Sequence, residues 1–137
     1  MQTKIVKFNQ NDVERVWPLA VEMIQLACDT NGGFDAKDIL AACKKGTYQL
    51  WLIVGDNDKV YASVVTELRN YPKLKVCDIK ITTGIMYKRW FHHIDDIAKW
   101  AKQQGCKKME VFARPGWERV LKHKGYVKTH VQIEKNL

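Results

Sequence analysis

The sequence predicts one α/β domain over residues 1–137, with a mixed, mostly antiparallel sheet and helices on both of its faces. Three observations lead to this class. Segments with period-two and with helical periodicity follow each other in the order β-α-α-β-β-β-α-β-α-β. The three central strands are separated only by short turns, so we expect an antiparallel meander. One long amphipathic helix then joins two strands, and such a crossover makes those strands parallel neighbours.

The N-terminal part contains a strand and a helical region with an internal break. Residues 4–8 alternate in polarity, which is typical of a strand. Asn11 or Asp12 then caps a helix, and seven apolar side chains recur on one face of it: Val13, Val16, Trp17, Ala20, Met23, Ile24 and Ala27. Pro18 lies inside this pattern and has no amide proton, so we expect it to kink the helix or to split it in two.

A second, short helix and the central strands come next. Asp35 is the expected cap of this helix, and Gly46 is its expected end. The three strands that follow are predicted over residues 49–54, 60–68 and 74–82. The first of them is almost entirely apolar, as in a strand that is covered on both faces.

The most regular helix of the chain precedes the C-terminal elements. Its apolar residues step down one face and are Trp90, Ile94, Ile97, Ala101 and Cys106. Gly105 is the expected C-cap. A strand, a short helix and a last strand are predicted after it, over residues 108–113, 117–124 and 126–134.

Composition and charge limit the classes of function. The net charge of +8 favours an anionic partner, such as a nucleic acid, the phosphates of coenzyme A or an acidic protein. The basic residues are scattered along the chain, however, which also fits an ordinary solvated surface. We find no leader peptide and no apolar run near the ~18 residues that span a bilayer, so we expect a soluble, cytoplasmic protein without a membrane partner.

The spacing of cysteines and histidines predicts no metal site. Cys28, Cys43, Cys77 and Cys106 form no C-x-x-C pair and lie among apolar residues, so we expect four reduced, buried thiols. The neighbours His92 and His93 point about 100° apart on a helix and do not share a ligand face.

Three short motifs, together with the order of elements, carry a resemblance to a known superfamily. They are Trp100-Ala101-Lys102-Gln103-Gln104-Gly105-Cys106 before a strand, Arg114-Pro115-Gly116-Trp117, and Lys122-His123-Lys124-Gly125-Tyr126 before the last strand. With them the chain resembles the GNAT superfamily of acyl-CoA N-acyltransferases over nearly its whole length. It is most similar to a small branch from phages and prophages, which includes internal virion proteins. The resemblance implies acetyl-CoA as the cofactor and, for a phage protein, the host cytoplasm or the virion as its location.

The resemblance places a phosphate-binding loop at the start of the long helix. The loop of the superfamily reads Arg/Gln-x-x-Gly-x-Gly/Ala and falls here on residues 85–90, where neither glycine is present. A loop shifted to Gly84 has the hydroxyls of Thr82 and Thr83 and the charges of Lys88 and Arg89 available for phosphate. The alternative is that Gly84 serves a purely structural turn.

The catalytic residues of the superfamily are not all found at the matching positions of this chain. The position of the superfamily's tyrosine acid holds Leu121, which cannot donate a proton, and Trp117 stands where a small residue is common. Glu67 and Asp78 lie on neighbouring predicted strands, and either carboxylate can act as general base toward an amine. The alternative is that both are solvent-facing strand carboxylates paired with Arg69, Lys75 or Lys80.

Three functions therefore remain open. The first is an acyl-CoA-dependent N-acetyltransferase of an amine acceptor. The second is a non-catalytic GNAT-like protein that acts through its surfaces, by self-assembly or through a protein partner, as a virion core component or a binder of a host protein. The third, a nucleic-acid-binding module, rests on the charge of +8 alone.

Overall fold

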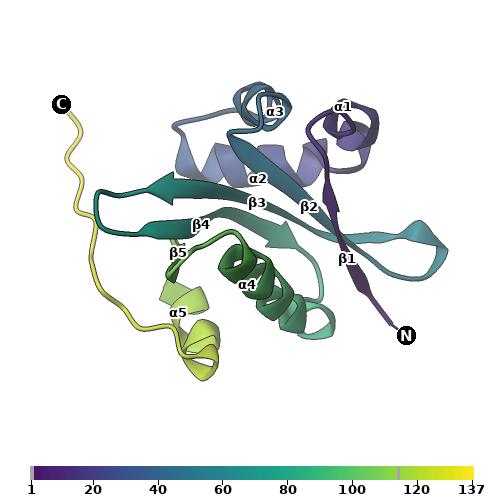
Figure 1. Cartoon of the computed structure of the whole chain (residues 1–137). Coiled ribbons are helices and arrows are strands. Elements are labelled where there is room, and N and C mark those ends of the chain that lie inside the picture. The colour runs from purple at the N-terminus through teal and green to yellow at the C-terminus, as the bar shows by residue number, and fades with distance from the viewer. Residues whose placement is uncertain (1, 114) are drawn as a thin grey trace.

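Five strands form one sheet, in a computed structural model that describes residues 2–113 and 115–137. The strands are β1 (Lys4–Phe8), β2 (Tyr48–Val54), β3 (Val60–Asn70), β4 (Lys75–Gly84) and β5 (Lys108–Val111). They lie in the order β1-β2-β3-β4-β5; the first four are antiparallel, and β5 runs parallel to β4 (Figure 1). This is the predicted fold class, with its antiparallel meander and its parallel crossover.

Helices cover both faces of the sheet. One face carries α1 (Val13–Val16), α2 (Val21–Asn31) and α3 (Ala36–Lys44), and the other carries α4 (Ile94–Gln103) and α5 (Pro115–Leu121) (Figure 1). Each face has its own apolar core. Leu50 and Leu52 of β2 belong to the core under α2 and α3, whereas Trp51 and Ile53 belong to the core under α4. None of the helices in the described part of the chain combines the length and apolar character that crossing a bilayer takes.

Most local predictions for the first half are confirmed. Asp12 stands at the N-cap position of α1, but its side chain makes no capping hydrogen bond. Pro18 lies in a 3-10 turn, Trp17–Leu19, that separates α1 from α2. Asp35 caps α3 in a capping box, because its carboxylate accepts from the amide of Asp38 at 3.3 Å while the Asp38 carboxylate accepts from the amide of Asp35 at 3.0 Å. The four cysteines are free thiols and buried.

The predicted long helix begins later than expected. The chain first makes two 3-10 turns, Tyr87–Arg89 and Phe91–His93, and α4 starts only at Ile94. Trp90, between the turns, is fully buried, and its indole N–H donates to the carbonyl of Ile85 at 2.7 Å. Burial of the Trp90 side chain therefore accompanies two 3-10 turns where helical periodicity predicts the start of the helix.

The predicted last strand is wrong for this chain. Residues 126–137 form no strand, and in Figure 1 they run as an extended tail from the region after α5 past the end of the sheet where β3 turns into β4. Gly125, at φ +89°, turns the chain at the end of the 3-10 turn Lys122–Lys124, and Tyr126 packs against the core under α4. The period-two pattern is present in the tail, but no described strand of the same chain pairs with it.

One extra residue interrupts the pairing of β3 with β4. Val65 pairs with Ile81 and Thr66 pairs with Ile79, so Lys80 has no partner across the ladder and forms a β-bulge. The bulge changes which face later side chains occupy: Cys77 and Ile79 point into the core under α4, whereas Ile81 points into the core under α2 and α3. Within a few residues, β4 thus contributes apolar side chains to the cores on both faces of the sheet.

Gly84, at the end of β4, is predicted to be essential for stability. A Cβ atom there meets the carbonyl oxygen of Tyr61 at 2.3 Å and the Cβ of Ala62 at 2.7 Å, so β3 and β4 must separate to accept it. We expect Gly84→Ala to lower the free energy of unfolding by about 1–3 kcal/mol, as overpacking does. Urea denaturation measures this, with Gly33→Ala as the control, because no atom lies within 4 Å of that position. Equal midpoints for the two variants contradict the prediction.

Candidate functional site

A cleft of about 310 Å³ opens beside the second half of β4. Its floor is the stretch of β4 from Ile79 to Gly84. Its walls come from three other parts of the chain: α2, the region from Phe91 into α4, and residues 111–113 together with Trp117 and Leu121 of α5. Such a cleft at a point where sheet strands diverge is a common place for a small-molecule site.

The backbone of β4 is open along this cleft. Parallel pairing of β4 with β5 covers Val76 to Ile79 and stops at the pair Ile79–Val111. Beyond it, no strand of the described chain pairs with residues 80–84 on the β5 side. Amide and carbonyl groups on an unpaired edge bind an extended ligand that carries amides of its own, in the way an added strand binds. β5 itself ends two residues earlier than predicted.

An aromatic wall closes one side of the cleft. The Trp117 ring stacks on Phe91, with the ring centroids 5.6 Å apart and the planes at 26°. Tyr87 and Trp90 approach the same indole edge-on and tilted, at 6.2 and 6.4 Å. Trp117 therefore lies against other aromatic rings and lines the cleft, and the space beside it stays open. Leu121, buried, lines the same cleft at the position where an acid was expected from the resemblance.

The structure separates the predicted phosphate ligands into two groups. Thr82, Thr83 and Gly84 line the cleft. Lys88 and Arg89 do not; they border a shallow hollow on the neighbouring 3-10 turn. Gly84 also has a structural reason to be glycine, given its contact with β3.

Some of the amides expected to hold phosphate are already used within the chain. The amide of Arg89 donates to Met86, that of Trp90 donates to Tyr87, and that of His93 donates to Trp90, at 2.9, 3.1 and 2.9 Å. The first turn of α4 carries two acidic residues, Asp95 and Asp96. Carboxylates here complement the positive end of the helix dipole, so they compete with a phosphate for the same place.

The His93 ring links this turn to the N-terminal strand. Its Nδ1 lies 2.8 Å from the Asp96 carboxylate, and its Nε2 lies 2.9 Å from the hydroxyl of Thr3. Within the described residues, no group of three His, Cys, Asp or Glu side chains is placed to hold a metal ion.

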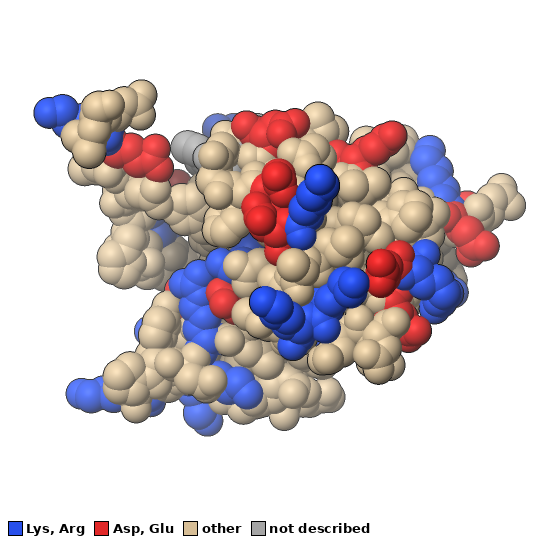
Figure 2. Space-filling model, turned by 90° about the horizontal axis from the view of Figure 1, so that it is seen from above, with Lys and Arg blue, Asp and Glu red and all other residues tan. Residues whose placement is uncertain are grey.

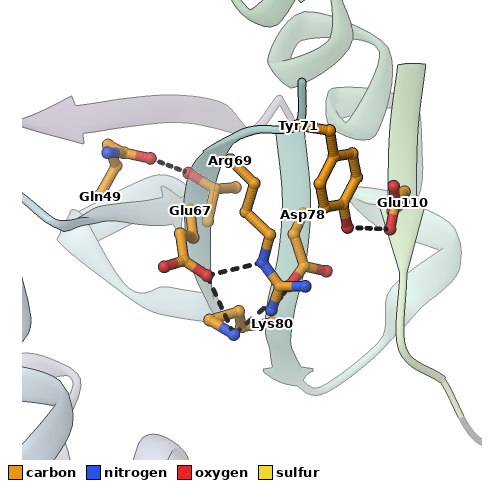
Figure 3. A network of polar contacts seen from close by, with 8 residues as sticks. Gln49, Glu67, Arg69, Tyr71, Asp78, Lys80 and Glu110 are labelled. Carbon is orange, nitrogen blue, oxygen red and sulfur yellow. Dashed lines mark hydrogen bonds and ion pairs between the residues drawn. The ribbon is translucent and has the colours of Figure 1, made fainter. Parts of the chain in front are cut away.

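The two candidate bases lie directly opposite each other, Glu67 on β3 and Asp78 on β4. Figure 3 shows them in one ionic network with Arg69 and Lys80. Glu67 lies 2.9 Å from the Arg69 guanidinium and 3.2 Å from the Lys80 ammonium. Asp78 lies 3.0 and 3.4 Å from the same two cations. Lys75, the third expected partner, instead donates to the carbonyl of Gln104 at 2.8 Å.

Lys80 connects this network to the cleft. It is the residue at the bulge, it pairs with both carboxylates, and it is part of the cleft wall. From the sequence, Lys80 is expected only as an ion-pair partner. Polar and apolar residues alternate regularly over residues 78–81, and this pattern gives no sign of a bulge. Asp78 differs from the expected solvent-facing carboxylate in being only 5% exposed.

The network fixes the charge state of Glu67. Burial by itself raises the pKa of this carboxyl, but hydrogen bonds from Arg69 and Lys80 and their positive charges outweigh burial and lower the pKa below its ordinary value of 4.5. The Glu67 hydrogen bond in turn raises the pKa of the Arg69 guanidinium, helped by Tyr71 and by the charge of Asp78. Glu67 is therefore ionised at neutral pH and a weak base while both cations hold it.

The lowered pKa of Glu67 predicts a pH-dependent contribution to stability. A carboxyl whose pKa is lower in the folded state stabilises the fold above its unfolded value of 4.5, and this contribution is lost as the pH falls through the folded pKa. We expect Glu67→Gln to be less stable than the wild type by about 1 kcal/mol at pH 7, with the difference closing below pH ~4.5. Urea titrations from pH 7 to 3 measure this. Glu22→Gln, which removes an exposed carboxylate of α2, is the control; an unchanged difference for Glu67→Gln at pH 3 contradicts the prediction.

Comparisons with known proteins identify the fold. No protein-family model matches the sequence, and no curated protein matches it. Among solved structures, a predicted acetyltransferase from Clostridium acetobutylicum with acetyl-CoA is 14% identical and has a TM-score of 0.71, with 98% of this chain and 96% of that chain covered. An aminoglycoside acetyltransferase from an uncultured soil metagenomic sample, in complex with sisomicin, is 12% identical at a TM-score of 0.69, with 98% and 96% covered.

A third similar structure comes from a plant. Glucosamine-6-phosphate N-acetyltransferase from Arabidopsis thaliana is 13% identical at a TM-score of 0.67, with 99% of each chain covered. The likeness thus extends over whole chains in all three cases. At these identities it concerns the backbone and not the individual site residues. The chain has the fold of the GNAT acetyltransferases.

Proposed function

We propose that the chain binds acyl-CoA in the cleft beside β4 and transfers the acyl group to an amine. The observation that carries the proposal is the open β4 edge at residues 80–84, in a fold shared with acetyltransferases. Pantetheine is an extended chain with two amide groups, so it can pair with the unpaired backbone of β4. The same backbone amides polarise the thioester carbonyl next to the bulge.

The reaction then needs a base and a leaving group. The amine nitrogen attacks the thioester carbonyl carbon, the C–S bond breaks, and the amine proton passes to a carboxylate. Glu67 and Asp78 are the proposed bases, directly or through water, because Lys80 links both to the cleft. Leu121 donates no proton, so CoA leaves as a thiolate that takes its proton from solvent water.

Phosphate binding is the weaker part of the site. We propose the Thr82 and Thr83 hydroxyls as ligands at the cleft end near Gly84. Lys88 and Arg89, on the next turn, contribute charge from outside the cleft. Because the amides of Arg89, Trp90 and His93 already bond within the chain, we expect affinity to come from the pantetheine arm more than from the phosphates.

Binding of acetyl-CoA is the first test. We expect isothermal titration calorimetry to give micromolar affinity for the wild type. Ala113→Trp fills the cleft and should weaken binding at least tenfold. Ala41→Trp, at an exposed position of α3 that is not part of the cleft wall, is the matched control and should bind like the wild type. No binding at millimolar acetyl-CoA overturns the proposal. Gly84 variants are unsuited, because they disturb β3.

Introducing an acidic hydroxyl at position 121, where the chain has leucine, tests the transfer step. Leu121 lines the cleft, and a tyrosine there places a hydroxyl near the leaving sulfur. General acids contribute about 10²–10⁴-fold in rate, so we expect Leu121→Tyr to raise kcat roughly tenfold or more with a suitable amine. Leu121→Phe has the same ring without the hydroxyl and is the control. Thiol release followed with a disulfide reagent measures the rate, and equal rates for the two variants contradict the role of this position.

A second candidate is a non-catalytic protein that uses the same fold for its surfaces. Three observations point to it: amides before α4 that bond within the chain, the acidic first turn of α4, and Leu121 in place of an acid. If the chain is encoded by a phage, such a protein serves in the virion core or binds a host protein. Absence of acetyl-CoA binding together with a normally folded protein favours this candidate.

The nucleic-acid-binding candidate depends on where the basic residues lie. On the face seen in Figure 2, Asp and Glu lie mainly in the upper half of the view, and Lys and Arg gather in the lower half with few acidic side chains among them. A partial gathering of this kind keeps the nucleic-acid candidate open, and binding that weakens steeply as salt is raised is the result that would support it.

A further inference from the structure

The cleft beside β4 has an apolar side, which faces α4 and α5 (Figure 1). The described residues that form it carry no charge and all belong to the core under α4 or pack against it: Ile79, Phe91, Ile94, Val111, Trp117 and Leu121. Three of them, Ile79, Ile94 and Leu121, are only 2%, 2% and 5% exposed. Little water therefore contacts this side of the cleft, and a group that enters it passes from water to a hydrocarbon surface.

The opposite side of the cleft, toward α2, holds the charges. Asp78 lies between Cys77 and Ile79, which point into the core under α4, so its side chain points to the other face of β4. Glu67 lies opposite Asp78 on that face, and the Lys80 ammonium is 3.2 and 3.4 Å from the two carboxylates (Figure 3). Among the described residues of the cleft wall, Lys80 is the charged one. The amine of an acceptor finds its ionic partners on this charged side.

The order of residues along β4 sets the direction of a bound acyl-CoA. In the proposed function, the phosphates lie toward Gly84 and the thioester lies beside the bulge at Lys80. The acyl chain beyond the thioester then continues toward Ile79. There the pair Ile79–Val111 joins β4 to β5, so the acyl chain has to leave the plane of the sheet. It turns either to the charged side or to the apolar side.

We propose that the acyl chain turns to the apolar side, and that the protein prefers an acyl-CoA with a straight chain longer than acetyl, represented here by hexanoyl-CoA. This inference rests on the proposed acyl transfer and names the class of its acyl donor. The transfer step itself is the same, with the longer acyl group in place of acetyl.

The chemistry of the two sides decides the direction. A hydrocarbon chain against Glu67, Asp78 and Lys80 removes water from charged groups and offers them no hydrogen bond, which is unfavourable. Between Ile94 and Leu121 the same chain is buried against apolar surface, and each methylene group removed from water strengthens binding about fourfold. Leu121, which provides no proton, then serves as a wall of the acyl site.

Isothermal titration calorimetry with CoA, acetyl-CoA and hexanoyl-CoA tests the proposal on the wild type itself. Hexanoyl-CoA should bind at least about tenfold more tightly than acetyl-CoA, because it carries additional methylene groups for burial. Equal affinities for acetyl-CoA and hexanoyl-CoA overturn this inference but leave the proposed binding of acyl-CoA intact. No binding of any of the three ligands overturns both.

Substitutions by phenylalanine show which side receives the chain. Leu121→Phe enlarges a residue of the apolar side and should abolish the preference for hexanoyl-CoA. Val111→Phe narrows the same side from β5 and should have the same effect, which keeps the test valid if position 121 does not accept a larger ring. Leu19→Phe, at a position that is 58% exposed and outside the cleft wall, is the control and should keep the preference. Circular dichroism checks that each variant folds.

The same substitution on the α2 wall gives the opposite outcome a clear signature. Leu26 lines the cleft on the charged side. If Leu26→Phe abolishes the preference for hexanoyl-CoA while Leu121→Phe and Val111→Phe keep it, the acyl chain lies on the charged side and the proposal is wrong.

Discussion

The extra residue in β4 at Lys80 is the constraint on which both the core and the cleft depend. It moves Ile81 to the opposite face from Ile79, so one strand supplies apolar side chains to both cores within a few residues. The register with β5 ends at Ile79, immediately before the bulge, because the added twist turns β4 away from its parallel neighbour. The cleft and the unpaired backbone of residues 80–84 follow from that divergence.

The same residue joins the electrostatics to the cleft. Lys80 and Arg69 lie against both Glu67 and Asp78 across the β3–β4 pair, so the nearly buried Asp78 side chain has two cationic partners, at 3.4 and 3.0 Å. A carboxylate held this firmly is a poor base until a substrate displaces one cation. The network is therefore compatible with acyl transfer only if the amine, itself a cation before it loses a proton, takes the place of Lys80 or Arg69. In an enzyme, the substrate amine must therefore be able to displace one of these two cations. In a protein that keeps the network only for stability, no such displacement is needed.

The sequence predicted what depends on local chemistry. Pro18 split the first helical region, Asp35 capped α3, and the hairpin turn brought Glu67 and Asp78 face to face. It did not reveal the bulge, because residues 78–81 alternate regularly and the shift depends on pairing with β3. The late start of α4 depends on the burial of Trp90, and the missing last strand depends on where the tail finds a partner. The cleft contains three of the predicted phosphate ligands, Thr82, Thr83 and Gly84, because they lie on β4 itself. Lys88 and Arg89 lie outside it, on a 3-10 turn that precedes the late start of α4.

Hydrogen exchange of the β4 amides with and without acetyl-CoA tests the central claim most directly. If the open edge receives the pantetheine arm, amides within residues 80–84 exchange more slowly when the ligand is bound, and those of residues 75–79, already paired with β5 and β3, change little. Slower exchange only in the region of residues 85–93, or ligand binding with no change in β4, contradicts the account and places the ligand away from the bulge.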